Sequence, residues 1–282
     1  KTDPYAIESK YIYEKQPQLI EPAKNAASDA EAKILYELSN MLSWENSLSA
    51  TLFAGWVVIA PVCAMLEWRP HIQIAGAANS GKSTIADHIL KNLIEWFSIM
   101  VHGGTSEASI RHKLKHNALP IIIDEAENEG KVKRQMTDIL QLARISSSGG
   151  QISKLSMERK GEVDDFRARS CFCFLGINSA ISEFADETRF SKLHLIVNKS
   201  EDAAEHFEEI EEIISNHINK EYAQKLFART VNNLPLLLKN IRTFQKAAQK
   251  VLKDSRAAKQ IAPMLAGAAL LHNLNEVRPS QA

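Results

Sequence analysis

The sequence predicts an α/β protein built on a parallel sheet of five strands flanked by helices, and three observations support this. An apolar alternation at residues 71–75 ends in a glycine and continues at once into a helical pattern. The runs at 121–123 and 171–175 are apolar throughout, which is typical of parallel strands buried on both faces. Strand-like and helix-like segments alternate from residue 70 to 198, the order that forms a parallel sheet with crossover helices. The five strands are expected at residues 71–76, 98–102, 121–123, 170–176 and 193–197.

The stretch after the first strand has the spacing of a phosphate-binding loop. Gly76, Gly81, Lys82 and Ser83 occupy the fixed positions of the pattern G-x-x-x-x-G-K-[S/T]. Glycine lets the backbone approach an anion, lysine reaches the β- and γ-phosphates, and the serine hydroxyl is a ligand for Mg²⁺. The sequence therefore predicts a site for ATP and Mg²⁺, with the nucleotide bound by Gly76, Ala77, Ala78, Asn79, Ser80, Gly81, Lys82, Ser83 and Thr84.

Two acids follow the apolar run at 121–123. Asp124 and Glu125 would stand at the carboxyl end of a central strand, where open α/β sheets bind their ligands. We expect Asp124 to hold Mg²⁺ with Ser83, and Glu125 to polarise the water that attacks the γ-phosphate. An acid pair that only caps a helix is the simpler alternative, but its place 42 residues after Lys82 favours catalysis.

The region before the first strand divides into two parts. Residues 1–30 contain three prolines and no sustained period, which indicates an arm or linker, and residues 31–69 indicate a helical layer. Within this layer residues 48–66 carry no charge, enough length to cross a bilayer. The segment contains Pro61 and leads directly into the nucleotide strand, so we expect a buried helix and no membrane partner.

A hairpin is predicted at residues 151–169, because an alternating run, a charged turn with a glycine and a second run follow one another. Lys154 lies on one arm, and Arg159 and Lys160 lie in the turn. Basic residues at a hairpin tip can bind phosphates in a channel, and they can equally serve to block pairing at a strand edge.

Two further polar residues stand near predicted strand ends. Asn178 follows the strand at 170–176 and would hold the attacking water, although asparagine also ends strands through its turn preference. Arg189 precedes the fifth strand and would reach a neighbouring subunit's nucleotide as an arginine finger. A surface ion pair with Asp186 or Glu187 is the alternative for Arg189.

Residues 199–282 indicate a helical lid over the 70–198 core. Phe207, Ile210, Ile213 and Ile214 form an apolar stripe in this region, opposite a run of glutamates that we expect to be solvated. Lids of this kind can present an arginine to the nucleotide. Arg229 and Arg242 are the candidates, with surface roles favoured for both.

Composition sets limits on partners and compartment. Lysine plus arginine equals aspartate plus glutamate at 34 each, so any contact with a polyanion must be local. The three cysteines lie in apolar runs without metal-ligand neighbours, which indicates reduced thiols in the cytoplasm. The chain begins with Lys1 rather than methionine, which favours a piece of a longer polypeptide.

Taken together, the loop at 76–83, Asp124 with Glu125, Asn178 and Arg189 resemble the Walker A, Walker B, sensor 1 and arginine-finger residues of an AAA+ ATPase. The resemblance covers residues 48–250. Within that class, the sequence is similar to the phage and mobile-element replicative helicases near the superfamily 3 and MCM-like branches. These helicases are often fused behind a primase-polymerase.

The resemblance implies a P-loop NTPase fold of the AAA+ type and ATP hydrolysis between the subunits of a homo-oligomeric ring, in this case a hexamer. It also implies single-stranded or forked DNA as partner, with Lys154, Arg159 and Lys160 facing the DNA. The rival interpretations are an ATPase that remodels or loads other proteins, and a small-molecule kinase.

Overall fold

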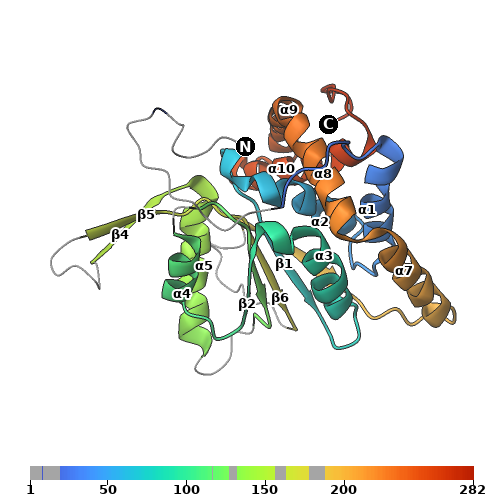
Figure 1. Ribbon diagram of the computed structural model, residues 1–282, viewed down its shortest axis with the longest axis horizontal. Helices are drawn as coiled ribbons and strands as arrows, with labels where there is room; N and C mark the ends of the chain where they lie inside the picture. The colour runs from blue at the N-terminus through green and yellow to red at the C-terminus, as the bar shows by residue number, and fades with distance from the viewer. Residues whose placement is uncertain (1–7, 9–19, 116, 127–131, 156–162, 178–187) are drawn as a thin grey trace.

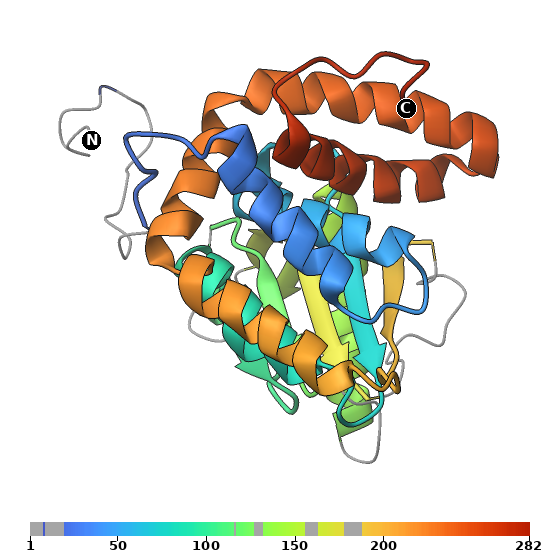
Figure 2. The ribbon, with the colours of Figure 1, turned by 90° about the vertical axis from the view of Figure 1, so that its right-hand side faces the viewer.

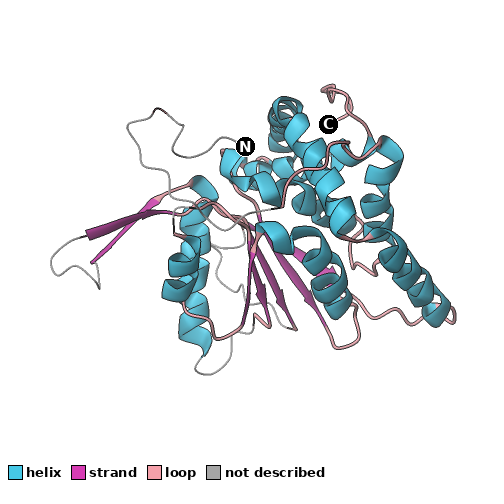
Figure 3. Ribbon diagram, viewed as in Figure 1, coloured by secondary structure: helices cyan, strands magenta, loops and turns pink. Residues whose placement is uncertain are grey.

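The computed structural model describes residues 8, 20–115, 117–126, 132–155, 163–177 and 188–282. Its centre is a parallel sheet of five strands with helices against both faces (Figure 1 and Figure 3), as the sequence predicts. The strand order is β2-β3-β6-β1-β7. The bounds are β1 His71–Gly76, β2 Ile99–His102, β3 Ile121–Asp124, β6 Phe172–Gly176 and β7 Phe190–Leu195.

The two faces of the sheet belong to two separate apolar clusters. Ile122 packs into the larger cluster, whereas Ile121 and Ile123 pack into the smaller one. All three side chains are fully buried. This alternation explains why a continuous β-branched run was needed in β3, since each face has its own helical cover.

The last strand begins three residues earlier than expected. Phe190 pairs with His71 across β1 and is buried in the smaller cluster, so β7 extends back from Leu193. Because strand β7 lies parallel to β1, Leu195 pairs with Gly76 at the carboxyl end. The strand register thus fixes which residues lie at the amino-terminal and carboxyl ends of the strands.

The helical segments that follow β1, β2 and β3 pack on the sheet. Residues 84–97 form one helical stretch of changing pitch: a π-helix Thr84–Leu90, α3 Lys91–Ile94 and a 3₁₀ turn Glu95–Phe97. The remaining two helices are α4 Glu107–Leu114 and α5 Val132–Ser148. Figure 1 shows α4 and α5 together on one side of the sheet, and α3 on the other.

The predicted hairpin is present. Strands β4 Gln151–Leu155 and β5 Val163–Arg167 pair antiparallel, with Gln151 opposite Arg167 and Leu155 opposite Val163. Figures 1 and 3 show the two strands projecting from the body, away from the five-stranded sheet.

The helices before and after the sheet region pack together. They are α1 Asp29–Met41, α2 Leu48–Ile59, the 3₁₀ turn Ala60–Met65, α7 Ala203–His217, α8 Lys220–Asn232, α9 Leu234–Leu252 and α10 Ser255–His272. Helix α10 packs against both α2 and α9, and α1 packs against α10 and α7. In Figure 2, α9 is the outermost helix, with α10 between it and the layer of α1 and α2.

Helices α2 and α10 cross at two glycines. A Cβ on Gly55 would lie 1.8 Å from the carbonyl oxygen of Met264, and a Cβ on Gly267 would lie 2.5 Å from the carbonyl oxygen of Gly55. The backbones touch there, which only glycine allows. The apolar segment Leu48–Met65 is long enough for a membrane span, and 72% of it is buried in this packing.

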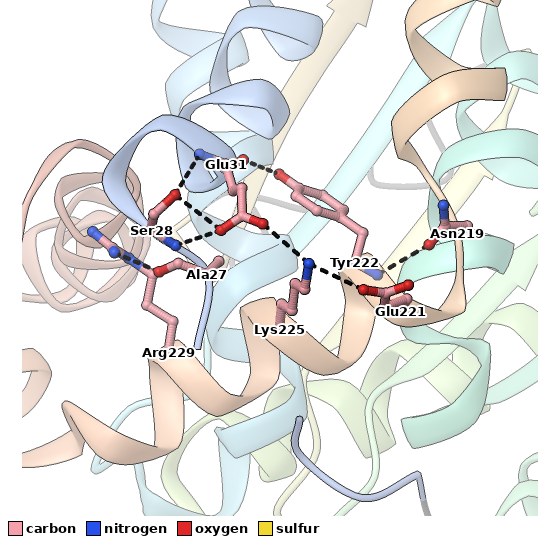
Figure 4. Close-up of polar contacts among 8 residues, drawn as sticks. All are labelled: Ala27, Ser28, Glu31, Asn219, Glu221, Tyr222, Lys225 and Arg229. Atoms are coloured by element: carbon pink, nitrogen blue, oxygen red, sulfur yellow. Dashed lines mark hydrogen bonds and ion pairs between the residues drawn. The ribbon is translucent and has the colours of Figure 1, made fainter. Parts of the chain in front are cut away.

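Helix α1 begins at Asp29, directly after its N-cap residue Ser28. Ser28 forms a capping box with Glu31. Hydrogen bonds from Ser28 and Lys225 hold the pKa of Glu31 at about 2 (Figure 4). The capping box therefore also ties α1 to α8.

Candidate functional site

A large cleft opens at the carboxyl ends of β1, β3 and β6, with a volume of about 1010 Å³. One half of its wall comes from the loop after β1 and from the end of β3. The other half comes from the residues after α1 and β7 and from α7. The lining residues are Leu42, Ser43, Ala78, Asn79, Ser80, Gly81, Lys82, Ser83, Thr84, Asp87, Gly103, Asp124, Glu125, Gly176, Ile177, Ile196, Asn198, Ala203, His206, Phe207 and Ile210.

The loop after β1 has the backbone conformation of an anion-binding turn. Asn79 and Gly81 both have positive φ, at 62° and 92°, whereas Ser80 between them does not. Such alternation turns successive N–H groups toward a common point. Gly76 is required at the start, because a Cβ there would lie 2.5 Å from Ser80 Oγ and 2.8 Å from the carbonyl oxygen of Leu195.

Two polar side chains of this loop are suited to binding phosphate. The Nζ of Lys82 donates to the carbonyl oxygens of Gly76 and Ala77, so the cation lies folded over its own loop. The buried Ser80 hydroxyl has no hydrogen-bond partner among the described residues. An ammonium, a hydroxyl and convergent amides at a helix start are suited to phosphate oxygens.

The acids at the end of β3 sit beside this loop. Asp124 is half-buried, and its Oδ1 accepts a hydrogen bond of 2.9 Å from the backbone N–H of Glu125. Glu125 is exposed to the cleft and has φ of 54°, which costs about 1–3 kcal/mol for a non-glycine residue. Strain of this kind is found where a side chain must be aimed.

Gly103 makes this strained turn fit. Its N–H donates to the carbonyl oxygen of Asp124 at 2.7 Å, and a Cβ on Gly103 would lie 2.3 Å from the carbonyl oxygen of Glu125. The glycine after β2 therefore supports the backbone that carries both acids. Its role was not visible in the sequence, because only the pairing of β2 with β3 brings it there.

The residues present suit a phosphate-bound Mg²⁺ ion. Ser83 and Asp124 line the same cleft, and Mg²⁺ is commonly held by one or two protein oxygens together with substrate phosphates. Across the described part of the chain, three or more His, Cys, Asp or Glu side chains nowhere cluster as a metal site would need. An ion carried in with the nucleotide needs no such cluster.

Cys173 of β6 pairs with Ile122 of β3, two residues before Asp124. Complete burial, together with the nearby Asp124 carboxylate, raises the pKa of the Cys173 thiol well above its usual range. The thiol therefore stays protonated and acts as a small apolar core residue. Cys63 and Cys171 are also free and buried.

The second half of the cleft is apolar and was not foreseen. Phe207 was expected in the core stripe of its helix, but it is 44% exposed and lines the cleft. Ile196 and Ile177 also remain half exposed there. The only sequence signal was an aromatic residue within an acidic helix.

His206 fixes the position of this wall. Its Nε2 lies 2.7 Å from the carbonyl oxygen of Met41, so α7 is held against the end of α1. Phe207 and Ile210 follow on the same helix. The wall opposite the phosphate loop is thus anchored by a specific hydrogen bond.

Of the other predicted catalytic and DNA-binding residues, three lie outside the described part of the chain and two lie within it. Asn178, Arg159 and Lys160 lie outside the described residues, and only the backbone of Lys154, in β4, is described. Arg189 stands one residue before β7, at the amino-terminal ends of the strands, where His71 begins β1. The phosphate loop leaves the carboxyl end of β1, about 20 Å away along six residues.

Arg229 is a structural residue, which corrects its candidacy as a lid arginine. It is 3% exposed and donates to the carbonyl oxygens of Leu270 and Ala27, at 2.7 and 2.8 Å, and to Asp29. Figure 4 shows it reaching from α8 toward the start of α1, among the other polar contacts of this junction. Arg242 lies on the exposed side of α9 and does not line the cleft.

A parallel five-stranded sheet, with a phosphate loop between β1 and its helix and acids at the end of β3, has the α/β fold of the P-loop nucleoside triphosphatases. No protein-family model and no curated protein matches the sequence.

Solved structures similar to the chain include three proteins. They are SCCmec type IV Cch, titled an active helicase (16% identity, 84% of this chain and 43% of that chain, TM-score 0.47), the JCV helicase with a bound compound (10%, 80% and 60%, 0.42) and the NrS-1 C-terminal region (12%, 88% and 69%, 0.38). The chain spans less than two thirds of the length of the first two. The function proposed below rests on the chain's own residues.

Proposed function

We propose that this chain hydrolyses ATP with Mg²⁺ and uses the energy to move along DNA, as the helicase module of a phage or mobile-element replication protein. The observation that carries the proposal is the single cleft that holds both the phosphate loop with Lys82 and the acids Asp124 and Glu125. Phosphate binding alone would require only the loop.

The cleft residues divide the chemistry between them. Backbone amides of residues 78–83 and the Lys82 ammonium bind the phosphates, and Ser83 with Asp124 would hold Mg²⁺. The ion would supply positive charge that offsets the negative charge of the phosphates. Glu125 accepts a proton from a water whose oxygen attacks the γ-phosphorus, and the bond to the β-phosphate oxygen breaks to release ADP.

The apolar wall offers a place for the nucleobase. Phe207 presents an aromatic side chain to the cleft, and Ile196 and Leu42 line the same half. A planar base buried between such groups gains apolar contact and stacking. The division of the cleft into a polar and an apolar half fits a nucleotide better than it fits a free phosphate.

The DNA part of the proposal rests on the hairpin and on the resemblance. Strands β4 and β5 project from the body, and the sequence between them includes Arg159 and Lys160. In a hexameric ring such hairpins would line the pore and contact one strand of single-stranded or forked DNA. The same proposal includes an upstream primase-polymerase domain and a cytoplasmic location.

One rival function has an observation in its favour. The chain has no net charge, so a protein-remodelling ATPase that never binds nucleic acid is the second candidate. A small-molecule kinase is disfavoured, because it has no use for a strained Glu125 beside Asp124.

ATPase measurements with and without single-stranded DNA separate these functions. We expect DNA to stimulate hydrolysis, and Lys160→Ala to weaken that stimulation while Lys24→Ala, an exposed lysine far from the hairpin in sequence, leaves it unchanged. Hydrolysis that DNA does not affect would favour the remodelling function. Absence of hydrolysis under any assembly condition would remove both.

A further inference from the structure

We propose that the outer face of α9 is a second nucleic-acid contact that binds the phosphodiester backbone, separate from the hairpin. The zero net charge of the chain conceals a strong local separation of charge. Between residues 239 and 278 there are eight lysines and arginines and two acids, so this segment carries a net charge of +6. The remainder of the chain is therefore at −6.

The basic residues of α9 share one face. Helix α9 contains no acid, and Lys239, Arg242, Lys246 and Lys250 recur at intervals of three and four, with Lys253 at its end. At 100° per residue these five positions fall within an arc of about 80°. All five are exposed, while Leu237, Asn240 and Ala248 on other faces are buried. We call these five cations the α9 stripe.

The stripe lies on a helix at the outside of the helical layer. Helix α10 lies between α9 and α2, and α9 forms the outermost layer in Figure 2. Lys239 forms an ion pair of 2.6 Å with Glu276 of the C-terminal segment. Lys246 and Lys250 also lie beside this segment, where they line a groove together with Pro279.

The acids of the segment are already engaged. Glu276 pairs with Lys239, and Asp254 caps α10, with its Oδ1 accepting from the backbone N–H of Arg256 at 2.7 Å and of Ala257 at 3.1 Å. Within the described residues Arg242, Lys246, Lys250 and Lys253 have no ion-pair partner. No described acid therefore balances the charge of these four cations.

The dimensions of the stripe suit a nucleic-acid backbone. From Lys239 to Lys253 it extends about 21 Å, at 1.5 Å per residue. That length covers about six nucleotides at 3.4 Å each. A groove of about 570 Å³ runs beside it, lined by Thr243, Lys246, Ala247, Gln249, Lys250 and Pro279, so two of the lysines stand at a concave surface.

Charge neutralisation along the stripe is the direct test. The variant Lys246→Gln/Lys250→Gln is compared with Lys24→Gln/Lys33→Gln, which removes the same charge from exposed lysines outside α9. Binding of fluorescent 20-base single strands and 20-base-pair duplexes is measured by anisotropy, without nucleotide, across a salt series. Thermal unfolding of each variant checks that it is folded.

We expect the α9 variant to bind roughly a hundredfold more weakly at about 50 mM salt. The slope of log affinity against log salt should become shallower by about 1.8 for duplex or about 1.4 for single strands, because two phosphate contacts are lost. Affinity and slope equal to those of the control variant would overturn the proposal. So would loss of binding to vesicles containing anionic lipid while DNA binding is unchanged, since the stripe would then be a lipid contact.

The outcome can be separated from that of the proposed motor function. The α9 contact requires no nucleotide, so the same affinity loss should appear in a Lys82→Ala background. If DNA-stimulated hydrolysis is found and the α9 variant binds DNA normally, only the second contact fails. If no hydrolysis is found and the α9 effect persists, only the motor function fails.

Discussion

The Nζ of Lys82 lies 2.8 Å from the carbonyl oxygen of Ala77 and also donates to the carbonyl oxygen of Gly76. The loop thus holds its cation over the space where backbone amides converge. Binding a nucleotide would exchange these carbonyl contacts for phosphate oxygens, which are stronger acceptors because they are charged.

Lys82→Ala should therefore weaken binding of Mg²⁺-ATP. Loss of a hydrogen bond to a charged group costs about 1.5–3 kcal/mol, so the Kd should rise about tenfold to a hundredfold. Isothermal titration calorimetry measures the change. Lys91→Ala, an exposed lysine on the helix that follows, is the matched control and should bind as wild type. An unchanged Kd for Lys82→Ala would mean that the loop does not bind phosphate.

Gly103→Ala should impair hydrolysis more than binding. The new Cβ would lie 2.3 Å from the carbonyl oxygen of Glu125, so the strained turn that aims this side chain must move. A misplacement of about 1 Å can lower a rate about a hundredfold. We expect kcat to fall at least tenfold with the Kd for ATP within about threefold, measured by steady-state ATPase and by calorimetry.

The control for this variant is Gly104→Asn. Gly104 has φ of 85°, where asparagine is strained less than other side chains, and nothing lies within 4 Å of a Cβ at that position. If Gly103→Ala hydrolyses ATP at the wild-type rate, the position of Glu125 does not limit the reaction.

Glu125→Gln should lower kcat by about 10² to 10⁴ with ATP binding retained, because the group that accepts the proton is lost.

The sequence predicted the sheet and the polar half of the cleft because their signals are local. The run at 121–123 must be a buried strand whatever surrounds it, and Asp124 then falls at its carboxyl end. The phosphate loop likewise depends on the spacing of neighbouring residues.

The apolar half of the cleft depends on distant contacts, which explains why it was missed. Phe207 follows His206, which contacts the end of α1, 165 residues away in sequence, and so holds α7 beside the cleft. Arg229 is structural because its acceptors come from α10 and from the residues before α1. A single sequence does not encode such pairs as a local pattern.

His71 should make the protein less stable in mild acid. Its Nε2 donates to the carbonyl oxygen of Ala143 at 2.7 Å, and its Nδ1 accepts from the backbone N–H of Phe172 at 3.1 Å, which fixes the neutral ring. Burial, with Arg69 and Arg189 nearby, lowers its pKa to about 3. The unfolded chain takes up a proton near pH 6.5, and the folded protein does not.

The His71 contribution is therefore complete above pH 6.5 and is lost as the pH falls toward 3, at up to about 1.4 kcal/mol per pH unit. Between pH 6.5 and 5 it should lower the free energy of unfolding by about 2 kcal/mol, as urea unfolding can measure. His71→Gln should remove this part of the pH dependence, and exposed His88→Gln should leave it in place. Equal pH dependence in wild type and His71→Gln would contradict the assignment.

Arg189 should act on the nucleotide of a neighbouring subunit. It lies at the amino-terminal ends of the strands, whereas the phosphate loop follows the carboxyl end of β1. The separation along β1 is about 20 Å, which is beyond the reach of one side chain. Arg189→Ala should bind ATP normally and lose about 10³-fold or more in kcat under assembling conditions, as expected for an arginine finger. Arg256→Ala, at an exposed arginine outside the cleft and the α9 stripe, serves as the control.

Mixing two inactive variants tests whether Arg189 acts between subunits. In an assembly of Arg189→Ala and Lys82→Ala chains, some interfaces combine an intact Lys82 on one subunit with an intact Arg189 on the next. ATPase activity of the mixture should therefore exceed the sum of the two variants measured alone, and should vary with their ratio. If Arg189 instead served its own subunit or only stabilised the fold, every chain would lack one required group, and mixing would restore no activity.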